Sequence, residues 1–198
     1  MIRLLLLALV AGPLAYLVLR WRRDRREDAL ARARAAFFVR SSEPLAPRRE
    51  PPPLREVTLT DGRLRFRVPA VWDDEPSPTG AYAARAPGSR RLSVDFDATR
   101  EAGPGDAAGI ADALERSEAG RQGVVQVLPG DRVLLKHVRT DRGPDAHLLY
   151  CWELWASRPG RGPLTAAFAF RVPAEALDAI TEDDLRLLER EIRNARLA

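Results

Sequence analysis

The sequence predicts an α+β protein: an N-terminal transmembrane helix followed by an antiparallel-sheet α/β/α sandwich. Three observations support this fold class. Residues 4–19 carry no charged side chain, which is typical of a helix that spans a membrane. Between residues 55 and 172, apolar and polar residues alternate with the period of two that indicates half-buried strands. The two helical patterns, one central and one terminal, do not alternate strictly with strands, which favours antiparallel pairing over βαβ units.

The apolar run is the predicted membrane anchor. At 1.5 Å per residue it extends ~24 Å, somewhat short of a ~30 Å hydrocarbon core, and snorkelling of Arg3 and Arg20 extends its reach. The main alternative is a cleavable signal peptide, but the run ends in arginines instead of a small-residue cleavage site. The predicted membrane-flanking residues are Arg20, Trp21, Arg22, Arg23, Arg25 and Arg26.

These arginines also predict the orientation. Because they crowd the C-terminal side of the run, the positive-inside rule places the following domain in the cytoplasm. We therefore expect a single-pass protein of the bacterial inner membrane with a cytoplasmic C-terminal domain. A periplasmic domain stays open as an alternative.

The chain divides into four segments. Residues 1–21 form the predicted transmembrane anchor, and residues 22–39, rich in Ala, Leu and Arg, a juxtamembrane helix. Residues 40–53 form a proline-rich linker that ends in Pro51-Pro52-Pro53, a semi-rigid spacer. Residues 54–198 form an α+β globular domain.

Within this domain the turn residues place the strands. Asp61-Gly62 is a strong hairpin signal and pairs residues 55–60 with 63–68. Helices are expected at 104–119 and from Thr181, as N-cap, to near the C-terminus. Further strands are expected at 80–86, 92–96, 123–128, 131–140, 146–156 and 163–172.

One short segment suggests a family. Phe66-Arg67-Val68-Pro69-Ala70-Val71-Trp72 resembles the strand, proline and tryptophan opening of PsbP-like domains, a superfamily that includes bacterial DcrB-like proteins. The order of the following elements is also similar: a charged hairpin, a strand, a helix, a long meander with a tryptophan-rich strand, and a terminal helix. The resemblance covers residues 57–197. It implies an α/β/α sandwich of small binding or assembly-factor type, generally without catalysis, and no family site residue carries over.

The charge distribution argues against nucleic-acid binding. The chain carries 32 basic and 28 acidic residues, a net charge of +4. Residues 1–53 hold 11 arginines against five acidic residues, a net charge of +6, which leaves −2 for residues 54–198. The basic character therefore belongs to the predicted anchor and linker, and the domain has no basic excess to attract a polyanion.

The polar residues of the domain predict no catalytic, cofactor or metal site. His147 and Cys151, with Asp145 and Glu153 beside them, fall on one predicted strand, where four residues separate His147 from Cys151 by ~13 Å, too far for a catalytic pair. His137 would approach Cys151 if residues 131–140 and 146–156 pair. Two histidines and one cysteine without ligand spacing do not indicate zinc.

Two features could bind an anion, although each has a simpler interpretation. Gly103-Pro104-Gly105-Asp106 precedes a helix but lacks the residues of a P-loop, so Asp106 is better interpreted as an N-cap. Arg63, Arg65 and Arg67 alternate along one strand and form a basic stripe, which is more simply a solvated or ion-paired face.

Three tryptophans are candidates for a groove: Trp72, Trp152 and Trp155. Core packing is the simpler interpretation of each, but Trp152 and Trp155 lie on opposite faces of one predicted strand. At least one of them is therefore expected in a groove or beneath a helix.

Together these observations predict a single-pass, membrane-anchored, non-catalytic binding or assembly domain that holds a partner protein near the membrane. Enzymatic activity is left open. The alternatives are a membrane-tethered enzyme that uses Cys151 or a histidine, and a sensor for a small ligand.

Overall fold

A computed structural model describes the globular part of the chain and a few helical residues before it. Described are residues 20, 27, 28, 31, 35 and 37, then 51–59, 62–77, 82–97, 106–140, 147–158, 162–173 and 179–198.

Ten strands and three helices are assigned within these residues. The strands are β1 (Leu54–Leu59), β2 (Leu64–Pro69), β3 (Asp73–Glu75), β4 (Tyr82–Ala86), β5 (Arg90–Asp97), β6 (Gly123–Leu128), β7 (Arg132–Thr140), β8 (His147–Ala156), β9 (Leu164–Pro173) and β10 (Arg196–Leu197). The helices are α2 (Ala107–Arg116), α3 (Glu118–Arg121) and α4 (Ala179–Arg193).

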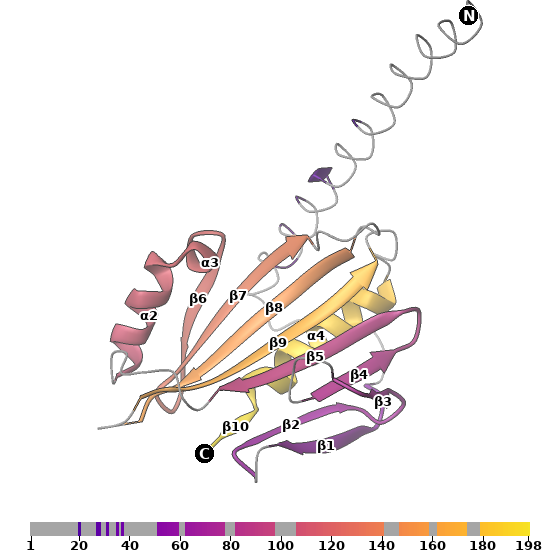
Figure 1. Ribbon diagram of the computed structural model, residues 1–198, viewed down its shortest axis with the longest axis horizontal. Coiled ribbons are helices and arrows are strands. Elements are labelled where there is room, and N and C mark those ends of the chain that lie inside the picture. Colours follow the sequence, from indigo (N-terminus) through magenta and orange to yellow (C-terminus); the bar gives the residue numbers. More distant parts are fainter. Residues whose placement is uncertain are drawn as a thin grey trace, which may run out of the picture.

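The strands form two antiparallel sheets (Figure 1). The smaller sheet has the order β1-β2-β10, and the larger one has seven strands in the order β3-β4-β5-β9-β8-β7-β6. The hairpins β6-β7 and β8-β9 are sequential, whereas β5 lies beside β9, far away in the chain. This one long-range pairing joins the two halves of the large sheet.

One face of the seven-stranded sheet, the covered face, carries the main core. The apolar stripe of α4 and the apolar side of the small sheet both pack on it. The Phe66 ring of β2 meets the Phe168 ring of β9 edge-on at 5.3 Å, and the Trp72 ring stacks on Phe170 at 5.6 Å. The covered face includes Leu92, Val94, Leu134, Val138, Leu148, Tyr150, Trp152, Leu154, Ala166, Phe168, Phe170 and Val172.

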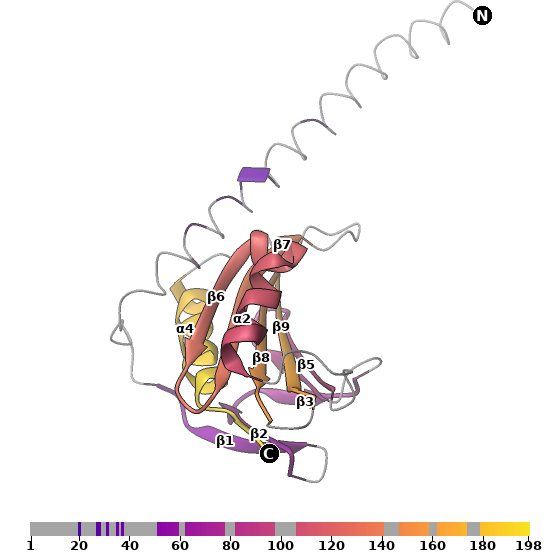
Figure 2. The same ribbon diagram turned by 90° about the vertical axis from the view of Figure 1, so that its left-hand side faces the viewer.

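The opposite side, the open face, is covered only in part by described residues. Helix α2 packs there over β6 and β7 through a small second core that includes Ile110, Leu114, Val133, Leu135 and Trp155. In Figure 2, α2 and α4 lie on opposite sides of the sheet. Strands β4, β5 and β9 have no described helix over this face.

Phe37 joins the main core from outside the segment predicted as the globular domain. Its ring is 4% exposed and lies 5.3 Å from both the Tyr150 and Trp152 rings, and the Lys136 ammonium lies 4.6 Å from its centre. The described core therefore begins at least as early as Phe37.

The expected strands are confirmed closely, since the hairpin of β1 and β2 and each later strand appear with only small shifts at their ends. The helix expected at 104–119 is instead two helices. Ser117 adopts extended backbone angles, ending α2 and accepting a hydrogen bond from Gly120 N at 2.9 Å as the N-cap of α3. Thr181 lies inside α4 instead of capping it, and its hydroxyl accepts a hydrogen bond from Arg90.

The predicted fold class is corrected in two respects. Two antiparallel sheets dominate the described chain, and the covered face is closed by α4 together with a second sheet, not by a helical layer alone. The apolar residues of β2 cause this difference, because they pack onto the large sheet as one side of its core.

The second correction concerns the membrane. No helix within the described part of the chain is long and apolar enough to span a bilayer. The described residues therefore do not support the membrane, single-pass and signal-anchor interpretation. The predicted anchor itself, residues 4–19, lies outside them, as do Trp21, Arg22, Arg23, Arg25 and Arg26 and most of the predicted juxtamembrane helix and linker. Arg20 is described as helical and exposed.

Candidate functional site

The residues considered as candidates for catalysis or metal binding lie mainly on the open face. Strands β7 and β8 pair so that His137 stands directly opposite Cys151, as expected for a hairpin of these segments. The His137 Nε2 atom lies 3.8 Å from the Glu153 Oε1 atom, a loose ion pair that exists only when the imidazole is protonated. His147 and Cys151 share this face, four residues apart on β8.

Cys151 is poorly suited to act as a nucleophile. Its thiol is buried and donates a long hydrogen bond of 3.9 Å to the Leu149 carbonyl oxygen. Burial raises the pKa of the Cys151 thiol to about 11, which the nearby positive charge of Arg139 only partly offsets. A catalytic cysteine needs its thiolate near neutral pH. Cys151 therefore resembles a small core residue more than a reactive one.

The register of strand pairing brings four arginines into one line across the open face. Arg85 on β4 pairs with Arg91 on β5, and Arg91 pairs with Arg171 on β9. Arg171 pairs with Leu149 on β8, and Leu149 pairs with Arg139 on β7. Residues that pair directly across antiparallel strands point to the same face. We call these four arginines the arginine row; their backbones span about 19 Å, or four strand spacings.

The contacts of the row are uneven. Glu75 on β3 forms ion pairs with both Arg85 and Arg91, the latter at 3.0 Å. Arg171 Nη2 lies 3.3 Å from His147 Nδ1, which must accept this hydrogen bond because a guanidinium has no acceptor. Arg85 and Arg139 are exposed.

The rows beside the arginines differ in size and charge. The next row along the strands carries four short side chains, Ala83, Ser93, Ala169 and Cys151, between Glu75 at one end and His137 at the other. The row after that carries Asp95 and Glu153, about 13 Å from the arginine row. Long basic side chains therefore stand beside short ones, with acidic groups further along the sheet.

The three tryptophans that were candidates for a groove, Trp72, Trp152 and Trp155, are all buried. Trp72 and Trp152 lie in the main core, 4% and 0% exposed. Trp155 points to the other face, 9% exposed beneath α2. All three pack in the interior, and Trp155 lies against α2.

The basic stripe of β2 is partly ion-paired. Arg67 Nε lies 2.8 Å from the Glu191 carboxylate of α4, which is itself 2% exposed. Arg63 and Arg65 are exposed, and Arg196 on β10 pairs directly with Arg65. The Asp106 side chain accepts a hydrogen bond from Gly109 N at 2.9 Å, which confirms the N-cap interpretation; residues 103–105 lie outside the described part.

Two networks of ion pairs and hydrogen bonds were not predicted from the sequence: one is buried in the core, and the other links the two sheets. Lys136, fully buried on the covered face, forms an ion pair with Glu189 of α4 at 2.8 Å, and Glu189 also accepts from Arg193. Burial lowers the pKa of Lys136, and Glu189 opposes this shift. The signal for Lys136 in the sequence was its position between Leu134 and Val138, the apolar residues on the same side of the strand.

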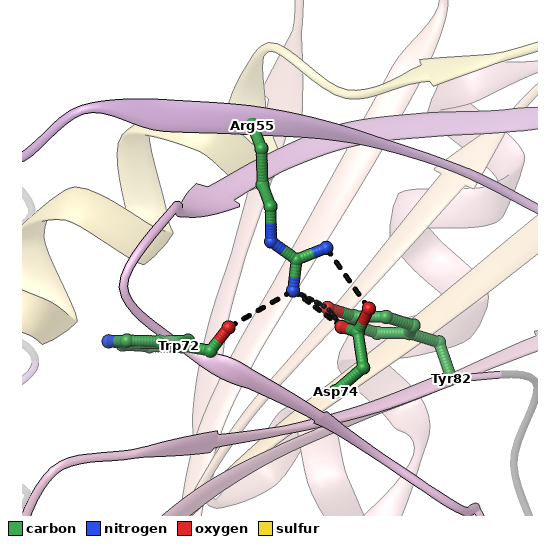
Figure 3. A network of polar contacts seen from close by, with 4 residues as sticks. All are labelled: Arg55, Trp72, Asp74 and Tyr82. Carbon is green, nitrogen blue, oxygen red and sulfur yellow. Dashed lines mark hydrogen bonds and ion pairs between the residues drawn. The ribbon is translucent and has the colours of Figure 1, made fainter.

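The second network ties the two sheets together at their edge (Figure 3). Arg55 of β1 donates to the Asp74 carboxylate at 2.5 Å, to the Tyr82 hydroxyl at 3.1 Å and to the Trp72 carbonyl at 3.2 Å. The Tyr82 hydroxyl donates to Asp74 at 2.7 Å. Burial and this hydrogen bond raise the pKa of Tyr82 to about 12. The network is exposed at Asp74 and holds β1 against β3 and β4.

The described residues contain no group of three His, Cys, Asp or Glu side chains placed to hold a metal ion. Comparison of the chain with protein-family models and with curated proteins gives no match. The geometry of the open face is therefore the basis for a functional proposal.

Proposed function

We propose that the domain is a non-catalytic binding module that holds a partner protein on the open face of its large sheet. The observation that carries this proposal is the contrast between the two faces. The covered face is closed by α4 and the small sheet, whereas α2 covers only the β6-β7 side of the open face among the described elements. Beyond α2 lie the half-buried Ser93 and Ala169 and the exposed Arg85 and Arg139.

A rigid sheet suits this role. Strands β5, β9 and β8 are paired along nearly their whole length, which fixes the backbone positions from which their side chains project. Specific protein interfaces need such fixed groups, because each group that is ordered only on binding costs affinity.

A steric block tests the proposal. Ser93, half-buried in the short-residue row, is replaced in Ser93→Trp, and the exposed Thr58 of β1 in the matched control Thr58→Trp. We expect the full-length wild type and the control to copurify with the same stoichiometric protein from the native cell, and Ser93→Trp to lose it. Circular dichroism melting establishes that both variants fold. Retention of the partner by Ser93→Trp at the wild-type level would show that the open face is not the binding surface.

The enzyme alternative rests on the pairing of His137 with Cys151 and is opposed by the raised pKa of the thiol. Replacing Cys151 by Ala and both histidines by Gln tests it, because partner retention by this triple variant is expected of a binding module. The resemblance to PsbP-like domains agrees with a binding role and stays a prediction. The inner-membrane location and cytoplasmic orientation also stay predictions.

A further inference from the structure

We infer that the arginine row binds an acidic, extended segment of the partner protein. This inference rests on the proposed function and names the chemistry of the partner. The row is a feature of the folded sheet alone, since its members are distant in sequence and are aligned by strand pairing.

The charge of the row favours carboxylates. The row has four guanidinium groups, and the described register places two acidic residues, Glu75 and Asp73, at its β3 end, where Glu75 pairs with Arg85 and Arg91. The excess is positive, and a guanidinium binds a carboxylate through two parallel hydrogen bonds. The β7 end of the row, at the exposed Arg139, is separated from Glu75 on β3 by the four strands β4, β5, β9 and β8.

The length of the row favours a chain over a small anion. A single carboxylate or phosphate contacts neighbouring arginines, which are about 4.8 Å apart between adjacent strands. A row of about 19 Å matches about six residues of an extended peptide. Leu149, half-buried between Arg171 and Arg139, offers an apolar contact in the middle. The expected ligand is therefore an acidic segment interrupted by an apolar residue.

Two observations favour a peptide over a nucleic acid. Asp95 and Glu153 lie about 13 Å from the row and repel a broad polyanion. Single-stranded nucleic acids are commonly held by aromatic side chains that stack on the bases. Among the described strand residues of this face, the one Phe, Tyr or Trp side chain is Trp155, which lies beneath α2.

Fluorescence anisotropy with a labelled decaglutamate peptide and the full-length chain tests the inference. We expect binding that weakens as salt is raised to the physiological range. The variant Arg85→Gln/Arg139→Gln removes the two exposed ends of the row and should weaken binding about tenfold. Arg91→Gln/Arg171→Gln should weaken it at least as much. The matched control, Arg63→Gln/Arg65→Gln, removes two exposed arginines of the β2 stripe and should stay within about twofold of the wild type.

Each other outcome is decisive. Equal losses in the control and in the row variants would overturn the inference, because binding would then follow total charge. Tighter, row-dependent binding of an oligothymidine than of decaglutamate would overturn it in favour of nucleic acid. If decaglutamate does not bind but Ser93→Trp still loses the native partner, the acidic chemistry is wrong and the binding face stands. If neither occurs, both proposals fail.

Discussion

The covered face and the open face of the large sheet are built from the same strands but accommodate charge in opposite ways. On the covered face, buried ionic groups are paired with α4: Lys136 with Glu189, and Arg90 with Asp184 at 2.5 Å. On the open face, arginines from four strands stand in a row with exposed ends. Buried charges need a partner to offset their desolvation, whereas exposed ones contribute little to stability. The two faces therefore differ in how charge is placed: the covered face pairs its buried charges with α4, and the open face carries the exposed arginines to which we assign the proposed binding.

The largest expected effect comes from the core of the covered face. Phe168→Ala removes a ring that is 1% exposed and packs against Phe66. We expect the free energy of unfolding to fall by about 3–5 kcal/mol, measured by urea denaturation. The neighbouring open-face residue provides the control: Ala167→Ser should change it by less than about 0.5 kcal/mol. Similar losses in both variants would contradict the contrast between the faces.

The next effect concerns the buried ion pair, where the two partners should differ. Glu189→Gln leaves the fully buried Lys136 ammonium without its carboxylate, and we expect a loss of about 3 kcal/mol. Lys136→Met should cost much less, because Glu189 keeps Arg193. Adding Lys136→Met to Glu189→Gln should restore most of the loss in urea denaturation.

The same pair gives a pH dependence. The pKa of Lys136 is lowered in the folded state, so the unfolded chain binds the proton more readily as the pH approaches 10.5. Stability from this group therefore rises with pH in that window. In Glu189→Gln the rise should begin at lower pH, because the carboxylate that raises the pKa of Lys136 is absent. An identical pH profile in both proteins would contradict this assignment.

A smaller effect is expected at the network that joins the sheets. Asp74→Asn removes the carboxylate bound by Arg55 and Tyr82, and since Asp74 is 61% exposed, the loss should be about 1 kcal/mol or less. The pKa of Tyr82, about 12 in the wild type, should move toward 10. Because the folded pKa is raised, stability from Tyr82 falls as the pH rises from 10 to 12. Tyrosinate absorbance, with Tyr82→Phe as reference, measures the shift.

The smallest effect on stability is expected from the arginine row. Arg85→Gln/Arg139→Gln changes two exposed side chains and should alter the free energy of unfolding by less than about 0.5 kcal/mol. Urea denaturation at the salt concentration of the binding assay measures it. A loss of several kcal/mol would show that the row holds the fold together and would remove the distinction between the faces.

Local patterns were sufficient to predict most strands but not the sites. The run at residues 123–128, followed by the turn residues Pro129-Gly130, predicted β6 with its observed bounds. Strand β3 has three residues and β10 has two, too few for any periodic pattern. The arginine row could not be foreseen, because each arginine is an ordinary polar position within its own strand. Only the pairing of β5 with β9, which no local signal indicates, places Arg91 beside Arg171.

For the candidate site residues too, contacts that are local in sequence were predictable, whereas contacts with distant segments were not. The hairpin of β7 and β8 is local, so the approach of His137 to Cys151 was predictable. The burial that raises the pKa of Cys151 depends on neighbours distant in sequence, so this shift could not be predicted from the sequence. The stripe of Arg63, Arg65 and Arg67 was visible because it lies within one strand, yet the partner of Arg67 comes from α4.

Phe37 determines how the protein can be shortened. Its ring covers Tyr150 and Trp152 and lies against the Lys136 ammonium. A fragment that starts at Leu54 matches the boundary suggested by the prolines but uncovers these three side chains to water. A fragment that starts ahead of Phe37 keeps them enclosed and should melt at a higher temperature. Studies of the isolated domain therefore need to retain this single phenylalanine.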